Sequence, residues 1–159
     1  MDTKAIRHNI LEPVKAEYQA AFHTLRETLL CIPVEHWLEG KDKLREPIRQ
    51  VCHLLFALEN YLGRHKARKG GRFGTGVESF VSKVDRRKCP EPSDILPWID
   101  EVMEIADRHI ERAVDLSLCT KAKQHPPLKR VLYVLRHTTV HLSYLIWELR
   151  ARGVACRGY

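Results

Sequence analysis

The chain has 159 residues, with 27 lysines and arginines against 20 aspartates and glutamates, a net charge of +7 when the histidines are neutral. A length near 150 residues predicts a single domain, residues 1–159, which can bury a hydrophobic core without disulfides. Its 44% hydrophobic and 30% charged residues exclude a disordered chain.

The sequence also argues against a membrane or secreted protein. No stretch approaches the ~18 consecutive apolar residues of a membrane helix, and the first eight residues contain no apolar signal-peptide core. The cysteines are odd in number and form no C-x-x-C pair: Cys31, Cys52, Cys89, Cys119 and Cys156. We therefore expect reduced thiols, a cytoplasmic location and no membrane partner.

Apolar residues recur with helical spacing in four segments, and no segment has a convincing strand pattern. The first segment covers residues 5–30, where Pro13 either starts the helix or kinks it. The second begins at Pro47 and ends near Lys66, before a pair of glycines that stops it.

The third helix is predicted from residue 93 or 94 to Ser117, and the fourth from Pro126 to Gly153. A glycine suits the left-handed position that closes many helices. Four amphipathic helices of similar length predict an all-α fold, a four-helix bundle. The connection between the second and third helices is long, about residues 67–92, whereas the third and fourth are joined by a short one.

Two of the nine histidines, His137 and His141, lie four residues apart in the middle of the fourth helix. This spacing places their Cβ atoms ~5–6 Å apart on one face, at the margin of the predicted core. Two such imidazoles can bind one divalent ion, although many H-x-x-x-H pairs occur by chance. Six other histidines are interpreted as structural or surface residues: His8, His23, His36, His65, His109 and His125.

His53 interrupts an apolar run in the second helix, between Val51-Cys52 and Leu54-Leu55-Phe56-Ala57-Leu58. Burying an imidazole there is unfavourable unless a metal ion or a backbone carbonyl satisfies its ring nitrogens. His53 points away from the densest apolar stripe of its helix, so either this helix is buried on several sides or His53 faces outward. The near-continuous apolar run favours the first alternative.

Three neutral histidines and one open position are typical of a catalytic or Lewis-acid metal site. No thiolate is expected as the fourth ligand, because Cys52 adjoins His53 but points ~100° away around the helix. In another interpretation, hydrogen bonds alone satisfy all the histidines and no metal binds.

Three segments together resemble the DinB-like superfamily of four-helix bundles, also called the DinB/YfiT-like metalloenzymes. The segments are Ile32-Pro33-Val34-Glu35-His36-Trp37, then His53-Leu54-Leu55-Phe56-Ala57-Leu58-Glu59, and finally His137-Thr138-Thr139-Val140-His141 followed by Leu149-Arg150-Ala151-Arg152-Gly153. The resemblance implies a divalent metal ion, nickel or zinc, bound by His53, His137 and His141. It also implies frequent homodimers and activation of a low-molecular-weight thiol for transfer or isomerisation chemistry.

Two residues near these motifs are candidates for supporting roles. Glu59 could orient a ligand histidine, or it could be a surface residue or a salt-bridge partner. Ser143-Tyr144 stand where family members often have Gly-Gln or a similar pair, and Tyr144 could line the pocket or close it. No catalytic residue is assigned.

The first functional hypothesis is therefore a divalent-metal-binding four-helix bundle with thiol-dependent transferase or isomerase chemistry. The alternative is a non-enzymatic binding module that uses a dimer face or the basic segment 64–88. That segment is interpreted as a solvated loop, or as an anion or nucleic-acid patch, on the basis of Arg64, Lys66, Arg68, Lys69, Arg72 and Arg86-Arg87-Lys88. Nucleic acid is disfavoured as a partner, because only Phe73 and Phe80 are interleaved as stacking residues.

Overall fold

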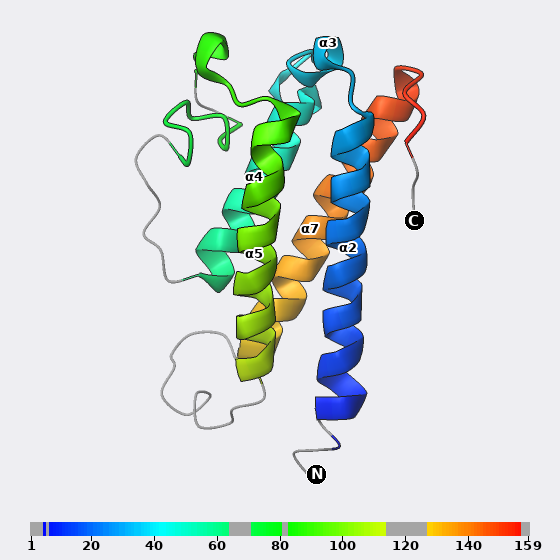
Figure 1. Ribbon diagram of the computed structural model, residues 1–159, viewed down its shortest axis with the longest axis vertical. Helices are drawn as coiled ribbons and strands as arrows, with labels where there is room; N and C mark the ends of the chain where they lie inside the picture. Colours follow the sequence, from blue (N-terminus) through cyan, green and yellow to red (C-terminus); the bar gives the residue numbers. More distant parts are fainter. Residues whose placement is uncertain (1–4, 6, 64–70, 81–82, 114–126, 157–159) are drawn as a thin grey trace.

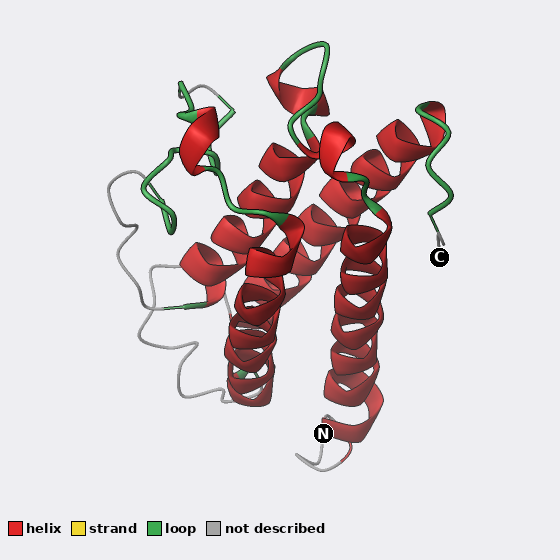
Figure 2. Ribbon diagram, turned by 45° about the horizontal axis from the view of Figure 1, so that its top comes forward, coloured by secondary structure: helices red, strands yellow, loops and turns green. Residues whose placement is uncertain are grey.

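The computed structural model describes residues 5, 7–63, 71–80, 83–113 and 127–156. Within these ranges every regular element is a helix and no strand occurs, which confirms the all-α prediction (Figure 2). The long helices are α2 (Glu12–Cys31), α4 (Pro47–Leu62), α5 (Pro92–Arg112) and α7 (Pro127–Ala151). The short elements are the π-helical turn η1 (Arg7–Leu11), the helix α3 (Val34–Trp37) and the 3₁₀ turns η2 (Lys43–Arg45) and η3 (Arg86–Lys88).

The helix boundaries follow from local sequence signals. Pro13 lies in the first turn of α2, directly after η1, where a missing amide hydrogen costs nothing. α4 opens at Pro47 and ends before Gly63, four residues earlier than predicted. Gly153, just after α7, has a φ of 80°, the left-handed conformation that glycine adopts without strain. The predicted end of the third helix and its short joint to the fourth lie outside the described residues.

The four long helices pack side by side (Figure 1). α2 contacts α5 and α7, α4 contacts the same two helices, and α4–α7 is the most extensive of these interfaces. Between the helices lie large apolar side chains such as Phe22, Leu55, Trp98 and Leu142, each at most 2% exposed. Burial of one such side chain contributes ~1.5–3 kcal/mol, so this core fixes α4 against α7. The arrangement is compatible with a four-helix bundle.

Two buried aromatic side chains fix distant segments by hydrogen bonds to backbone carbonyls. The Tyr18 hydroxyl donates to the Val131 carbonyl at 2.7 Å and so joins α2 to α7. The Trp37 indole N–H of α3 donates to the Pro90 carbonyl at 2.7 Å. Trp37, in the first of the three motif segments, therefore holds α3 against the start of α5.

The described parts of the long connection between α4 and α5, residues 71–80 and 83–91, are joined to the helices by ion pairs. Arg72 makes a two-pronged contact with Glu101 of α5, at 2.6 and 2.7 Å, and its guanidinium lies 5.2 Å from the centre of the Trp98 ring. Arg86 bonds Glu46, next to α4, at 2.8 Å. These contacts place the connection beside α4 and α5.

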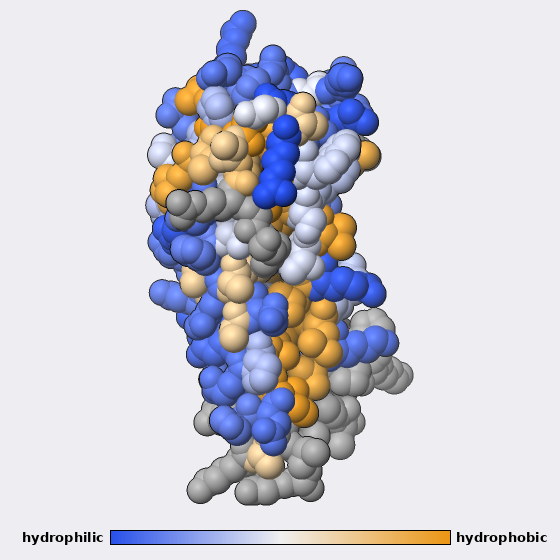
Figure 3. Space-filling view, turned by 90° about the vertical axis from the view of Figure 1, so that its right-hand side faces the viewer, coloured by the Kyte–Doolittle hydropathy of each residue, from blue (hydrophilic) through white to orange (hydrophobic). Residues whose placement is uncertain are grey.

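Hydrophobic side chains also reach the surface of α2 and α7. Figure 3 shows the side that faces right in Figure 1, where hydrophobic residues form a band between hydrophilic ones. Leu30 of α2 and Val140 and Trp147 of α7 are each more than half exposed. Of the helices the structure describes, none combines the length and the apolar character needed to cross a bilayer.

Candidate metal centre

His53, His137 and His141 come together between α4 and α7. One ring nitrogen from each of the three side chains lies within 4.8 Å of those of the other two. The ring centres of His137 and His141 are 4.4 Å apart, and His53 lies 5.4 and 4.8 Å from them respectively. All three side chains are half-buried. His53, which lies 84 positions before His137 and 88 before His141 in the sequence, thus joins them in one cluster of nitrogen donors.

The packing of α4 explains why His53 faces this cluster. The helix is buried on more than one side, because Val51, Cys52, Leu54 and Leu55 are all 0% exposed. His53 consequently points into the α4–α7 interface rather than into solvent, which is the first of the two alternatives that the sequence left open. His137 and His141 meet it from successive turns of α7.

Gln50 fixes the orientation of His141. The Gln50 side-chain NH2 donates to the Leu44 carbonyl, so its amide oxygen is directed toward His141. That oxygen lies 2.7 Å from Nδ1 of His141 and can only accept, which requires Nδ1 to carry the proton. Nε2 of the neutral ring is then a free lone pair, the form in which histidine binds metal ions.

Glu78 fixes the orientation of His53 in the same manner. Nδ1 of His53 lies 2.9 Å from the Glu78 backbone carbonyl, an obligate acceptor. The Glu78 side chain is buried, and its Oε1 accepts the Arg72 backbone N–H at 2.7 Å. The carboxylate therefore holds the loop in place, the carbonyl holds the His53 ring, and Nε2 of His53 remains available.

His137 is the member of the cluster whose hydrogen bonding is incomplete. Its Nδ1 is buried and has no hydrogen-bond partner. A buried, unpaired imidazole nitrogen costs about 1–3 kcal/mol, and such a group calls for an explanation. Beside two rings whose Nε2 atoms are free, a metal ion is the ligand that would make this arrangement favourable.

The electrostatics favour the neutral form of two members of the cluster, His137 and His141. Burial, followed by the neighbouring charges of His137 and His53, lowers the pKa of His141 to about 4. Burial and the neighbouring charge of His53 also lower the pKa of His137. Neutral imidazoles have the lone pairs that metal coordination requires, so no proton needs to leave these two rings before a metal ion binds at pH 7.

Aromatic rings cover part of the cluster. Phe80, from the long connection, lies 4.6 Å from the His53 ring and 6.0 Å from the His141 ring, with an interplanar angle of 13° to the latter. Tyr133 lies 6.3 Å from His137. These rings lower the local polarity and restrict the approach of solvent to the nitrogen donors.

The donor set fits a divalent transition metal with an open position. Imidazole–zinc bonds of ~2.0–2.1 Å place tetrahedral donors roughly 3.4 Å apart, so modest side-chain rotation would close the present separations. Among the described residues no cysteine or carboxylate joins the three histidines. Burial, followed by the nearby charges of Glu78 and Cys89, raises the pKa of the Cys52 thiol well above its ordinary value, which disfavours a thiolate.

The other predicted candidates do not have the expected roles among the described contacts. The Nδ1 atoms of His53 and His141 are oriented by Glu78 and Gln50 rather than by Glu59. Tyr144 packs its ring 6.0 Å from that of Trp147. In the basic segment, Arg64 to Lys69 lie outside the described residues, whereas Arg72, Arg86 and Lys88 form ion pairs with Glu101, Glu46 and Asp85. Those three cations are already partly neutralised.

Sequence reasoning missed Gln50, Glu78 and Phe80. Gln50 carried a usable signal, because it is a polar residue one turn before His53 and directly precedes the apolar pair Val51-Cys52. Glu78 bonds His53 through its backbone carbonyl, which leaves no trace in the sequence. Phe80 was considered only as a nucleic-acid stacking residue.

Comparison of the chain with protein-family models, with curated proteins and with solved structures found no match. The resemblance to the DinB-like superfamily therefore rests on the three sequence segments and stays a prediction.

Proposed function

We propose that this protein is a four-helix bundle of the DinB-like type that binds one divalent metal ion, nickel or zinc, through His53, His137 and His141. The observation that carries the proposal is the convergence of the three rings, with one ring nitrogen each within 4.8 Å. Two further features support it. The hydrogen bonds of Gln50 and Glu78 leave Nε2 of two rings free, and the buried Nδ1 of the third has no partner.

The alternative in which hydrogen bonds alone satisfy the histidines explains less. Gln50 and Glu78 each satisfy one nitrogen of one ring, but His137 Nδ1 is left unpaired. A structural cluster would be expected to pair that atom. Metal coordination would use the free nitrogens, and the pKa values of His137 and His141, which burial lowers, favour the neutral rings that coordination requires.

A metal ion at this site would act as a Lewis acid that deprotonates a bound thiol or water near neutral pH. The protein's own contribution is to orient the donors through Gln50 and Glu78, and to hold a hydrophobic wall at Phe80 next to the open position. A low-molecular-weight thiol as the bound substrate, a transfer or isomerisation reaction, a homodimer and a cytoplasmic location remain parts of the proposal that follow from the resemblance.

Metal content tests the proposal. Protein purified without a histidine tag is loaded with nickel or zinc, freed of excess metal and measured by inductively coupled plasma mass spectrometry. We expect about one ion per chain for the wild type and a small fraction of that for His137→Ala/His141→Ala.

A matched control removes two histidines elsewhere. His8 and His23 are both exposed, so His8→Ala/His23→Ala should retain the full metal content. Equal metal content in the two double variants, or no bound metal in the wild type, would contradict the proposal.

A further inference from the structure

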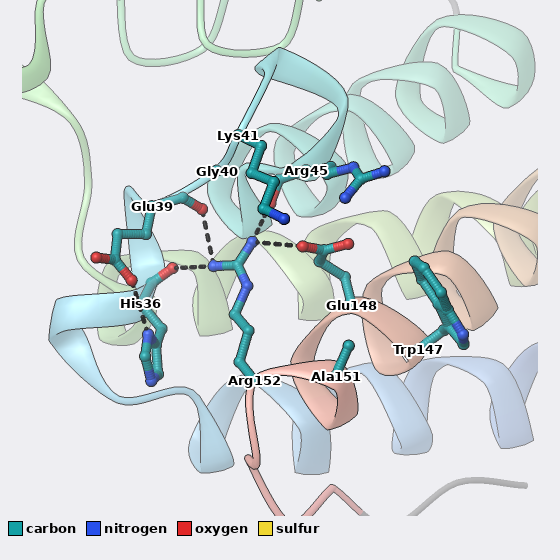
Figure 4. A pocket seen from close by; sticks show the side chains of 9 residues that line it. All are labelled: His36, Glu39, Gly40, Lys41, Arg45, Trp147, Glu148, Ala151 and Arg152. Atoms are coloured by element: carbon teal, nitrogen blue, oxygen red, sulfur yellow. Dashed lines mark hydrogen bonds and ion pairs between the residues drawn. The ribbon is translucent and has the colours of Figure 1, made fainter.

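A hollow lies at the C-terminal end of α7, beyond His137 and His141 in the sequence. It has a volume of about 440 Å³, which is within the range of small-molecule sites. Its walls come from α3, from the segment before α4 and from the end of α7, as Figure 4 shows. It is lined by His36, Glu39, Gly40, Lys41, Arg45, Trp147, Glu148, Ala151 and Arg152.

One wall of the hollow is rigid because Arg152 is fully engaged. Its guanidinium donates to the carbonyls of His36, Glu39 and Arg45 at 3.3, 2.8 and 2.6 Å. It also bonds the Glu148 carboxylate at 3.0 Å. Both side chains are at least 86% buried. Arg152 and Glu148 therefore neutralise each other and fix the end of α7 to the preceding loop.

The cations that remain for a ligand are Lys41 and Arg45. The Lys41 ammonium is exposed and has no ion pair or hydrogen bond among the described residues. Arg45 has one ionic contact, at 3.5 Å to the exposed Asp42, an interaction that contributes little in water. The Glu39 carboxylate is directed toward His36, whose Nδ1 lies 2.9 Å away, and away from Lys41 (Figure 4).

The aromatic wall of the hollow is Trp147. This indole is 57% exposed, whereas the other tryptophans, Trp37 and Trp98, are 2% and 0% exposed. A large aromatic side chain left in water beside a hollow can gain free energy by stacking on a flat ring. The Glu148 carboxylate lies between this indole and the Arg152 guanidinium (Figure 4).

We propose that this hollow binds a small organic anion with a flat aromatic ring, whose ring stacks on Trp147 and whose carboxylate or phosphate pairs with Lys41 and Arg45. A hollow of this size fits a small molecule. The site is separate from the histidine cluster and goes beyond the proposed metal binding. No residue of the hollow belongs to the metal ligand set.

The test uses two charged aromatic probes, 2-naphthoate and adenosine 5′-monophosphate, on the metal-free full-length protein. Their matched probes lack either the charge (2-naphthalenemethanol and adenosine) or the ring (acetate and inorganic phosphate). Quenching of tryptophan fluorescence reports binding at Trp147, because the other two tryptophans are buried. Isothermal titration calorimetry gives the affinities. At least one charged aromatic probe should bind tenfold or more tightly than both of its matched probes.

Variants locate the binding. Trp147→Ala and Lys41→Gln alter exposed side chains, so both proteins should fold, and each should lose tenfold or more in affinity. The control is Lys129→Gln, because Lys129 is an exposed lysine at the opposite end of α7. Its affinity should equal that of the wild type.

Three results would overturn the inference. In the first, neither charged aromatic probe binds. In the second, a probe that lacks the charge or the ring binds as tightly as its charged aromatic counterpart. In the third, Trp147→Ala and Lys41→Gln both bind the probe with wild-type affinity. The same titration on His137→Ala/His141→Ala should give wild-type affinity. Failure of metal binding therefore leaves this result standing, and loss of probe binding in that variant would show that the hollow is not an independent site.

Discussion

His141 donates from Nδ1 to the amide oxygen of Gln50 across 2.7 Å, although the two residues are 91 positions apart in the chain. Gln50 is 3% exposed and is itself held by the Leu44 carbonyl. The amide therefore cannot turn without breaking a hydrogen bond that is partly shielded from solvent. It commits His141 to the tautomer in which Nε2 carries a lone pair.

Replacement of Gln50 should weaken metal binding without removing a ligand. We expect Gln50→Ala to lower the metal affinity about 10–100-fold, the usual effect of losing the partner that orients a ligand histidine. Competition with a chromogenic chelator measures it. The control is Gln19→Ala, an exposed glutamine on α2. Equal affinities for the two variants would show that Gln50 has no orienting role.

Acid should destabilise the metal-free protein through His141. In the unfolded chain this imidazole takes up a proton near pH 6.5, whereas in the folded protein its pKa is about 4. Between these values the unfolded state binds more protons, so the stability present above pH 6.5 is lost as the pH falls. For His141 alone the loss is at most about 2 kcal/mol from pH 7.5 to pH 5, because the ring is only partly buried and solvent screens the shift.

Urea unfolding at the two pH values checks this prediction. In His141→Gln the loss of unfolding free energy between pH 7.5 and pH 5 should be smaller than in the wild type by that amount. In the control His23→Gln the loss should equal that of the wild type, because His23 is exposed. The same pH dependence in all three proteins would be incompatible with a buried, neutral His141.

Two Glu–Arg pairs with the same spacing test the role of burial. Glu148–Arg152, at the end of α7, and Glu104–Arg108, within α5, are both four residues apart. The side chains of the first pair are at most 14% exposed and those of the second are more than 60% exposed. Arg152→Ala leaves the buried Glu148 carboxylate without its partner, removes a donor from three carbonyls and should cost about 3 kcal/mol. Arg108→Ala should cost about 0.5 kcal/mol or less. If Arg152→Ala and Arg108→Ala lower the free energy of unfolding by the same amount relative to the wild type, burial does not determine what these pairs contribute.

Two glycines with similar backbone conformations test the Glu78 anchor. Gly71 and Gly74 have φ angles of 76° and 68°. A Cβ at Gly71 would lie within about 2 Å of the Glu78 carboxylate, whereas one at Gly74 would meet nothing within 4 Å. Gly74→Ala should cost about 1 kcal/mol of backbone strain.

Gly71→Ala should cost at least about 1 kcal/mol more, because the Glu78 carboxylate must leave its buried position. The same displacement should disturb the Glu78 carbonyl and thereby His53, so this variant should also bind metal more weakly. If the two alanine variants have equal stability and equal metal affinity, then the loop does not position His53.

Local patterns predicted the helices, and long-range contacts account for what was missed. Pro47 and Gly153 marked helix ends through their own backbone preferences, and the spacing of His137 and His141 placed both on one face of α7. The environment of His53 depends on which helices cover α4. A helical wheel of α4 alone does not show which neighbours those are. α3 was not predicted as a helix because four residues give no periodicity, and its position depends on the Trp37–Pro90 hydrogen bond.

The central claim is that the three histidines bind one ion, and anomalous diffraction from metal-loaded crystals tests it most directly. A difference map at the nickel or zinc absorption edge should show one peak between α4 and α7, within ~2.0–2.1 Å of a ring nitrogen of His53, His137 and His141. If the map shows no such peak after loading with equimolar metal, the account is contradicted. It is also contradicted if the strongest peak marks an ion bound by other residues.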